Sequence, residues 1–282
     1  MGDLNLRGRF RGCEMKATAW HDGHRTLYHW QRYDESRLAD ILLTQRVYCS
    51  NPGAFNDPWD CKPHFNSGVL SDPDENERHV QWAVDICRRN TPMSEQALES
   101  MRTTLLTDPV LAAELIDQNS RELGSFIDKI YRVYCLGPDV GNLLMWSHYA
   151  DNHRGVCLEF NLHNDVMCGA LRCQYLQDFP IMRLYETSEE ANLQILLAKS
   201  EVWSYEREYR LVALERGAMN VEGTLVTDNN FLQLPVGALQ AVIVGCQAEY
   251  KKIHKLVSDI APQVMVKRAM RVQNRYQLAI VG

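Results

Sequence analysis

Apolar and polar positions along this chain form short blocks that switch between the spacing of a strand and that of a helix. An aromatic run at 27–30 predicts a strand, and Asp34 is placed to cap a helix over 35–45 whose apolar residues fall on one stripe. The pattern at 47–49 is extended again. The first part of the chain therefore predicts a strand, a helix and a strand in quick succession.

The pattern between 72 and 125 is helical and predicts three helices. Strand signals resume after it, so we interpret this stretch as a helical insertion. The remaining expected elements are strands at 130–136, 155–160, 171–175, 208–214, 241–244, 264–268 and 277–281, and helices at 142–151, 189–203 and 247–260.

Short strands with helices between them favour the α+β class, with a split, bent mixed sheet and helices packed on it. We expect one domain over 27–282 that contains the insertion. Residues 1–26 mix Arg and Gly with polar residues, and we expect them to form a polar N-terminal extension.

Composition and charge narrow the classes of function. The formal net charge is −6, which provides no general attraction for nucleic acid or an anionic membrane, so a nucleic-acid partner is not favoured. No apolar run reaches the length of a membrane span, and the first residues lack the apolar core of a secretory signal. We therefore expect a cytoplasmic protein with no membrane partner.

The nine cysteines are scattered and contain no C-x-x-C pair. Several lie in apolar runs, which is typical of reduced thiols that act as small core residues. His148, His153 and Cys157 do not have the spacing of a standard zinc motif, so we expect no metal.

Three polar clusters among aromatic residues could carry chemistry. In the first, Tyr28 and His29 lie on the strand at 27–30, and the Pro- and Gly-broken loop 50–60 follows on the chain. A histidine beside such a loop can donate to ribose or phosphate oxygens. The alternative is a core histidine next to a rigid turn.

The second cluster lies within 142–155, where a helix would place His148 and Tyr149 near Trp146, with His153 just beyond. One face of this helix would pack, and its polar groups could reach a ligand. A purely structural role stays open for each of these residues.

The third cluster lies within 203–211. An extended conformation there would put Trp203, Tyr205, Tyr209 and Leu211 on one face and Glu206, Glu208 and Arg210 on the other. A carboxylate pair on a strand can stabilise a developing oxocarbenium ion or bind ribose hydroxyls. A solvated face with ion pairs is the alternative. The chain contains no G-x-S-x-G, P-loop or G-x-G-x-x-G motif, so hydrolase, phosphate-loop and Rossmann proteins lose their usual sequence support. An H-E-x-x-H motif is absent too.

Four strings occur in order: LYHW, SNPGAFNDPWD, NLLMWSHYADNHRG and WSYEREYRL. They resemble a bacterial family of domains of unknown function from about residue 27 to the C-terminus. More distantly, the same order resembles the ADP-ribosyltransferase fold. That resemblance implies NAD as substrate, His29 as a ribose-holding residue, Tyr48 or Ser50 as support for the nicotinamide side, and Glu208, with Glu206 before it, as the carboxylate that steers attack on the ribose carbon.

The leading hypothesis is an ADP-ribosyltransferase-like protein that uses NAD, in phage defence or a toxin–antitoxin system, with its acceptor unidentified. The alternatives are a non-catalytic nucleotide-binding or regulatory module on the same fold, and a metal-dependent nuclease or hydrolase that uses His148 and His153. The catalytic candidates are His29, Glu206 and Glu208. The substrate-binding candidates are Tyr28, Tyr48, Ser50, Asn51, Asn56, Asp57, Trp146, His148, Tyr149, His153 and Arg210.

Overall fold

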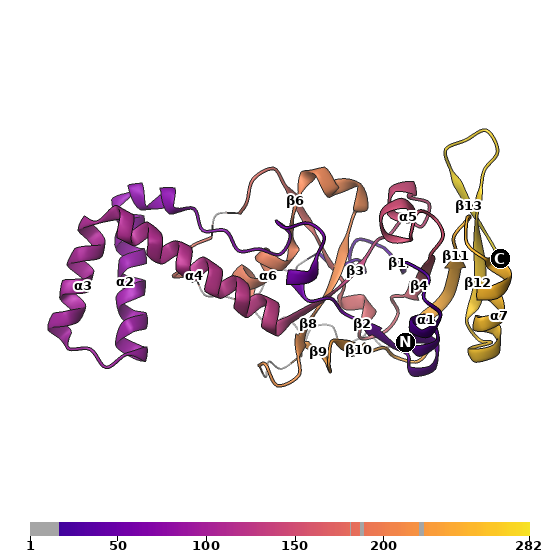
Figure 1. The fold of residues 1–282 in the computed structure, drawn as a ribbon, viewed down its shortest axis with the longest axis horizontal. Coiled ribbons are helices and arrows are strands. Elements are labelled where there is room, and N and C mark those ends of the chain that lie inside the picture. Colours follow the sequence, from indigo (N-terminus) through magenta and orange to yellow (C-terminus); the bar gives the residue numbers. More distant parts are fainter. Residues whose placement is uncertain (1–16, 181, 187–188, 220–222) are drawn as a thin grey trace.

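The computed structural model describes residues 17–180, 182–186, 189–219 and 223–282. The fold is α+β, as the sequence predicts, with open, bent sheets and a group of helices that projects from one end (Figure 1). The first sheet has the strand order β1 (Thr26–Gln31), β4 (Val156–Asn161), β11 (Leu239–Val244), β12 (Met265–Arg271) and β13 (Leu278–Val281). The second has the order β3 (Tyr131–Leu136), β8 (Tyr209–Glu215) and β5 (Leu171–Arg172), and β9 (Leu225–Thr227) pairs with β8.

The two sheets meet at β1 and β3. The backbone N–H of Tyr28 donates to the Gly137 carbonyl oxygen at 2.9 Å, and the Gly137 N–H donates back to Tyr28 at 2.8 Å. Two smaller pairs complete the strands: β2 (Arg46–Tyr48) with β10 (Phe231–Gln233), and β6 (Gln174–Leu176) with β7 (Ala198–Ser200). The expected strand, helix and strand at 27–49 are present, but β1 and β2 belong to different sheets.

Alternation along the strands places two cores on opposite faces of the first sheet. Val156, Leu158 and Phe160 of β4 point into the largest core, under α1 (Glu35–Thr44) and α7 (Tyr250–Ile260). Cys157 points to the other face, where it packs near Trp146 of α5 (Leu143–Tyr149). Asp34 caps α1 as predicted, because its side chain accepts from the Arg37 N–H.

The expected helical insertion is formed by α2 (Pro73–Asn90), α3 (Glu95–Thr107) and α4 (Pro109–Ile130), which project from the sheets (Figure 1). Asp72, Ser94 and Asp108 cap their N-termini. The three helices share a small apolar core of their own, and the end of α4 packs against the core beside β3.

The described part of the expected N-terminal extension is packed rather than extended away from the protein. Ala19 is fully buried in the main core, and its backbone N–H donates to the Ala170 carbonyl oxygen at 2.9 Å. Thr18 forms an isolated bridge with Leu171. Ala19 is a small residue within a polar stretch of the sequence, so the local pattern does not predict that it is buried. Residues 1–16 lie outside the described residues.

Three expected elements differ from the structure around the later motifs. The strand expected at 171–175 is divided into β5 and β6. The helix expected over 189–203 ends earlier, as α6 (Glu189–Leu197), because 198–200 pair with β6 as β7. The strand expected over 208–214 is present as β8, but the extended conformation considered for 203–208 is absent, since Glu201–Glu206 form a 3-10 helix and Arg207 has a left-handed φ of 49°. Trp203 and Tyr205 therefore do not share a strand face with Tyr209 and Leu211.

Candidate functional site

Five charged side chains are buried together where the loop 55–61 meets the start of β8. They come from the loop, from β7, from the 3-10 helix before β8, from the residue that precedes β8, and from β8 itself. We call the group the buried charge centre, and it consists of Asp60, Lys199, Glu206, Glu208 and Arg210, none of them more than 8% exposed. A buried charge is strongly unfavourable unless it is paired, so their contacts determine what the centre can do.

The Arg210 guanidinium binds two of the carboxylates through pairs of hydrogen bonds. Its Nε and Nη2 atoms donate to Glu208 at 2.9 and 3.0 Å, and its Nη1 and Nη2 atoms donate to Asp60 at 2.9 and 2.7 Å. Nη1 also donates to the Leu196 carbonyl oxygen at 2.7 Å. This is the fork geometry that arginine offers to carboxylates, and it fixes the orientation of both acids.

The Lys199 ammonium joins Glu208 to the remaining carboxylate, Glu206. Its Nζ atom donates to Glu206 at 2.5 Å and to Glu208 at 2.8 Å, and it lies 3.7 Å from Asp60. The other oxygen of Glu206 accepts from the Tyr149 hydroxyl at 2.6 Å. Each charged group in the centre is therefore bonded to an opposite charge.

The two glutamates respond differently to this setting. Burial raises the pKa of Glu206, and the nearby Lys199 ammonium offsets only part of that effect. Burial also pushes the pKa of Glu208 upward, but Arg210 and Lys199 together outweigh it and hold that pKa below its usual range. Glu208 is thus a firmly ionised anion between two cations.

Three thiols border the same centre. The Cys61 Sγ atom lies 3.0 Å from Arg210 Nη1. Cys135 and Cys173 interact electrostatically with Arg210 and Glu208. Burial raises the pKa of all three thiols. They are protonated near neutral pH, which makes them poor nucleophiles.

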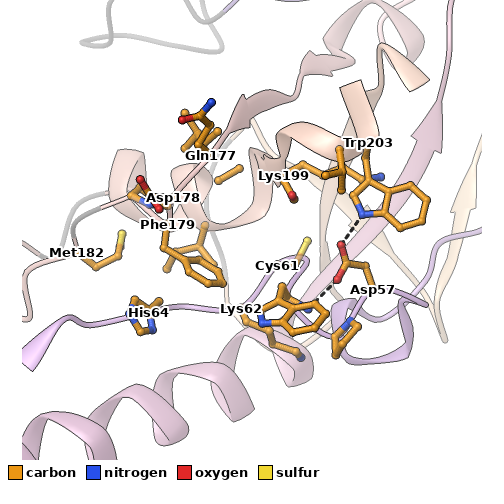
Figure 2. A pocket seen from close by; sticks show the side chains of 18 of the residues that line it. Asp57, Cys61, Lys62, His64, Gln177, Asp178, Phe179, Met182, Lys199 and Trp203 are labelled. Carbon is orange, nitrogen blue, oxygen red and sulfur yellow. Dashed lines mark hydrogen bonds between the residues drawn. The ribbon is translucent and has the colours of Figure 1, made fainter. Parts of the chain in front are cut away.

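A pocket of about 480 Å³ opens beside the centre, and Lys199 lies in its wall (Figure 2). The pocket lies between the loop 56–64, the segment 176–182 and the segment 195–203. Four rings line it, from Trp59, His64, Phe179 and Trp203. The Trp203 indole N–H donates to Asp57 at 2.7 Å, which ties the 3-10 helix to the loop across the pocket edge (Figure 2).

Residues from separate motifs thus meet at one place: Asp57 and Asp60 from the loop, Tyr149 from α5, and Glu206, Glu208 and Arg210 from the last motif. Residues 145–211 match DUF2971, a protein family of unknown function. The resemblance to an uncharacterised domain family is confirmed over this segment. The DUF2971 segment carries all of the buried charge centre except Asp60.

No curated protein and no solved structure matches the chain. The more distant resemblance to ADP-ribosyltransferases stays a prediction. In the part of the chain that the structure describes, no helix has both the length and the apolar character needed to cross a membrane.

His29 and Glu208, the two main catalytic candidates, lie on opposite faces of β3. His29 Nδ1 donates to the Cys135 carbonyl oxygen at 2.8 Å, and its ring stacks on Tyr134 at 4.3 Å. The Cys135 side chain instead hydrogen-bonds Glu208. Neighbouring residues of a strand point to opposite faces, so the sheet separates the imidazole from the carboxylate.

The loop candidates have different surroundings. Asn56 and Asp57 line the pocket. Asn51 accepts from the Gly53 N–H and donates to the Asp128 carbonyl oxygen, and Ser50 pairs with Val133 through the backbone. The Asn51–Asp128 bond and the Ser50–Val133 backbone pair hold the loop against α4 and β3. Tyr48 is 44% exposed and its ring contacts Phe231.

Tyr28 lies on β1 of the first sheet, where it pairs with Glu159 of β4, and it does not line the pocket. Burial, with a smaller contribution from Glu159, raises the pKa of Tyr28 to about 12. Trp146 is fully buried and donates to the Val140 carbonyl oxygen. His148 is exposed, and its ring lies 6.2–6.4 Å from the rings of Tyr149, Trp203 and Tyr205.

His153 belongs to a tight turn of the DUF2971 segment. Asp151, Asn152 and His153 have left-handed φ values of 47°, 52° and 65°, a conformation that Asn, Asp and His adopt more readily than most residues. His153 Nε2 lies 3.2 Å from the Ser147 hydroxyl, and the ring stacks on Trp146. Among the described residues, no three His, Cys, Asp or Glu side chains are grouped to hold a metal ion.

Sequence reasoning missed Lys199 and Trp203 as site residues, and it did not single out Asp60 within its loop. Lys199 lies in a segment whose apolar pattern predicts a helix, and no local pattern marks it as a buried ammonium. The extended interpretation of 203–211 places Trp203 on a strand face. A signal for Lys199 does exist in retrospect: Glu206, Glu208 and Asp60 outnumber the single cation Arg210, so another cation is needed.

Proposed function

We propose that this protein is a nucleotide-binding module that takes NAD or a related nucleotide in the pocket beside Lys199, without turnover at Glu208. The observation that carries the proposal is that an open pocket with aromatic walls adjoins a glutamate whose two oxygens are already bonded. The resemblance to ADP-ribosyltransferases implies both NAD binding and catalysis. The pocket favours NAD binding, whereas the bonded state of Glu208 counts against catalysis.

The pocket supports binding. Its volume of about 480 Å³ lies within the usual range for small-molecule sites. Rings such as those of Trp59 and Phe179 offer stacking surfaces for a base or a nicotinamide, and both side chains are well exposed, at 64% and 40%. Asn56 and Asp57 lie in the wall and offer polar groups for ribose hydroxyls.

The state of Glu208 counts against catalysis. A carboxylate stabilises a cationic sugar only if it can face the sugar in a water-poor site. Glu208 is 2% exposed and is bonded to Lys199 and Arg210. A substrate would have to displace both cations from a buried anion, and each lost pair costs several kcal/mol, roughly 3–5. His29 lies across β3 and does not complete the expected pair.

ADP-ribosyl transfer is the competing function, together with the phage-defence or toxin–antitoxin setting that the resemblance implies. Calorimetry with NAD and proton NMR for released nicotinamide separate the two. We expect NAD to bind without release of nicotinamide. Release by the wild type that disappears in Glu208→Gln would overturn the proposal in favour of transfer. Absence of any NAD binding would overturn both.

The pocket itself is tested with Trp59→Ala, since Trp59 is mostly exposed and its loss removes ring surface with little effect on folding. We expect NAD affinity to fall about ten-fold, the loss of roughly one stacking contact. Tyr276→Ala is the matched control, because Tyr276 is fully exposed and lies far from the pocket in the chain's last hairpin. Equal losses in the two variants would contradict binding at this pocket.

A further inference from the structure

The ammonium groups of the pocket are already engaged by carboxylates. The Lys62 Nζ atom lies 3.1 and 3.2 Å from the carboxylate oxygens of Asp128. The Lys199 Nζ atom is bonded to Glu206 and Glu208. Neither lysine therefore offers a free positive charge to a ligand, even though both line the cavity.

The carboxylates of the pocket wall lack such compensation. Asp57 is 8% exposed, and its oxygens accept from uncharged donors: the Trp203 indole N–H at 2.7 Å and the Trp59 backbone N–H at 3.0 Å. Within the described residues, no Lys, Arg or His forms an ion pair with Asp57 or with the exposed Asp178. The pocket thus carries uncompensated negative charge.

The rings of the wall add to this potential. The face of an aromatic ring is electronegative, and a cation over an indole is attracted to it. Trp203 already accepts a cation in this way, since Lys199 Nζ lies 5.5 Å from its ring centroid. His64 and Phe179 lie 4.9 Å apart at a tilt of 32° and form a second ring surface. Acidic groups and ring faces in one cavity favour a flat cation.

We propose that the pocket selects a cationic planar ring of the N-alkylpyridinium class over its neutral analogue. The inference deepens the proposed function and rests on it for the identity of the whole ligand, because the oxidised nicotinamide of NAD is such a ring. The ring enters among Trp59, Phe179 and Trp203, and Asp57 lies at the edge of the cavity to pair with its charge. The phosphates of a dinucleotide stay toward the solvent, away from the buried Asp57.

A pair of small probes tests the selectivity without the rest of the nucleotide. 1-Methylnicotinamide and nicotinamide have nearly the same shape and differ by one positive charge. We expect the full-length protein to bind 1-methylnicotinamide at least ten-fold more tightly, measured by quenching of tryptophan fluorescence and by calorimetry. Equal affinity for the two probes, or no binding of either, would overturn the inference.

Charge variants show whether the named carboxylates are responsible. Asp57→Asn and Asp178→Asn should each reduce the preference at least three-fold while leaving nicotinamide binding nearly unchanged. Asp178 is exposed, so its variant keeps the test valid if Asp57→Asn fails to fold. Asp117→Asn, an exposed acid on α4, is the matched control and should keep the full preference. A preference that is unchanged in Asp178→Asn and in a folded Asp57→Asn would contradict the assignment.

The outcomes separate this inference from the proposed function. Binding of NAD together with equal affinity for the two probes would leave nucleotide binding standing and reject charge selection. A clear preference for 1-methylnicotinamide without any binding of NAD would support charge selection and reject the nucleotide.

Discussion

The Lys199 ammonium lies 2.8 Å from the Glu208 carboxylate, and both groups are buried. The lysine comes from a short strand added after α6, and the glutamate from the residue before β8. Lys199 also forms part of the pocket wall, whereas Glu208 does not. Lys199 therefore separates the pocket from the buried acids, so that a ligand meets the ammonium before it can meet either glutamate.

Replacing Lys199 should destabilise the protein strongly. Among the described residues, Lys199→Met would remove the one cation paired with Glu206 and one of the two cations paired with Glu208. Breaking a buried pair leaves an uncompensated charge, so we expect a loss of about 3–5 kcal/mol in the free energy of unfolding, measured by urea titration.

The matched control for this substitution is Lys252→Met. Lys252 pairs with Glu35 on the surface, where its side chain is 53% exposed. Exposed pairs contribute little, so its urea midpoint should stay close to that of the wild type. Similar midpoints for the two variants would show that the buried centre is not held together by Lys199.

Arg210→Lys should fail to replace arginine despite keeping the charge. A lysine offers one nitrogen, whereas Arg210 uses three to bind Glu208, Asp60 and the Leu196 carbonyl oxygen. We expect a loss of about 2–4 kcal/mol in the free energy of unfolding. Arg216→Lys, at a side chain that is 70% exposed, should leave the midpoint unchanged. A wild-type midpoint for Arg210→Lys would contradict the importance of the fork.

The regular elements could be predicted where a periodic pattern and a cap coincide. Asp34 before α1 and the polar–apolar spacing of the insertion are examples, and both are local signals. The α+β class followed from the alternation of such blocks. The division of the strands into two sheets joined at Tyr28 and Gly137 depends on long-range pairing, which no local pattern encodes.

The candidate site was harder to predict, because its geometry depends on breaks in regular structure. Arg207 has a left-handed backbone conformation and ends the 3-10 helix. Glu206 on one side of this break and Glu208 on the other both bond to Lys199. The spacing of Glu206, Glu208 and Arg210 predicts one face of a strand. Burial of all three charges could not be seen in a charged string, which is usually exposed.

Gly155, the last residue of the string NLLMWSHYADNHRG, should tolerate no side chain. A Cβ atom at Gly155 would lie 2.2 Å from the Gln31 carbonyl oxygen and 2.9 Å from that of Ala150, and neither backbone group can move freely. We expect Gly155→Ala to reduce the free energy of unfolding by about 3 kcal/mol. Gly169→Ala is the control, since a Cβ there meets nothing within 4 Å. Equal melting temperatures for the two variants would contradict this close packing.

The neutral state of His29 should make the stability depend on pH. Burial lowers the pKa of His29 from 6.5 to about 4, and the bond to the Cys135 carbonyl oxygen offsets only part of this. Between these values the unfolded chain binds more protons than the folded one, so stability is complete above the unfolded pKa and falls as the pH drops toward 4.

The titration of His29 should therefore lower the free energy of unfolding of the wild type by about 2 kcal/mol when the pH falls from about 7.5 to about 5. His29→Gln keeps a neutral donor near Cys135 and removes the titration, so its stability should fall by about 2 kcal/mol less over the same range. Other groups titrate in both proteins, and the difference between the two isolates His29. His254→Gln, at an exposed position on α7, should follow the wild type. Urea titrations at the two pH values measure the difference, and parallel losses in wild type and His29→Gln would show that His29 accepts a proton without unfolding.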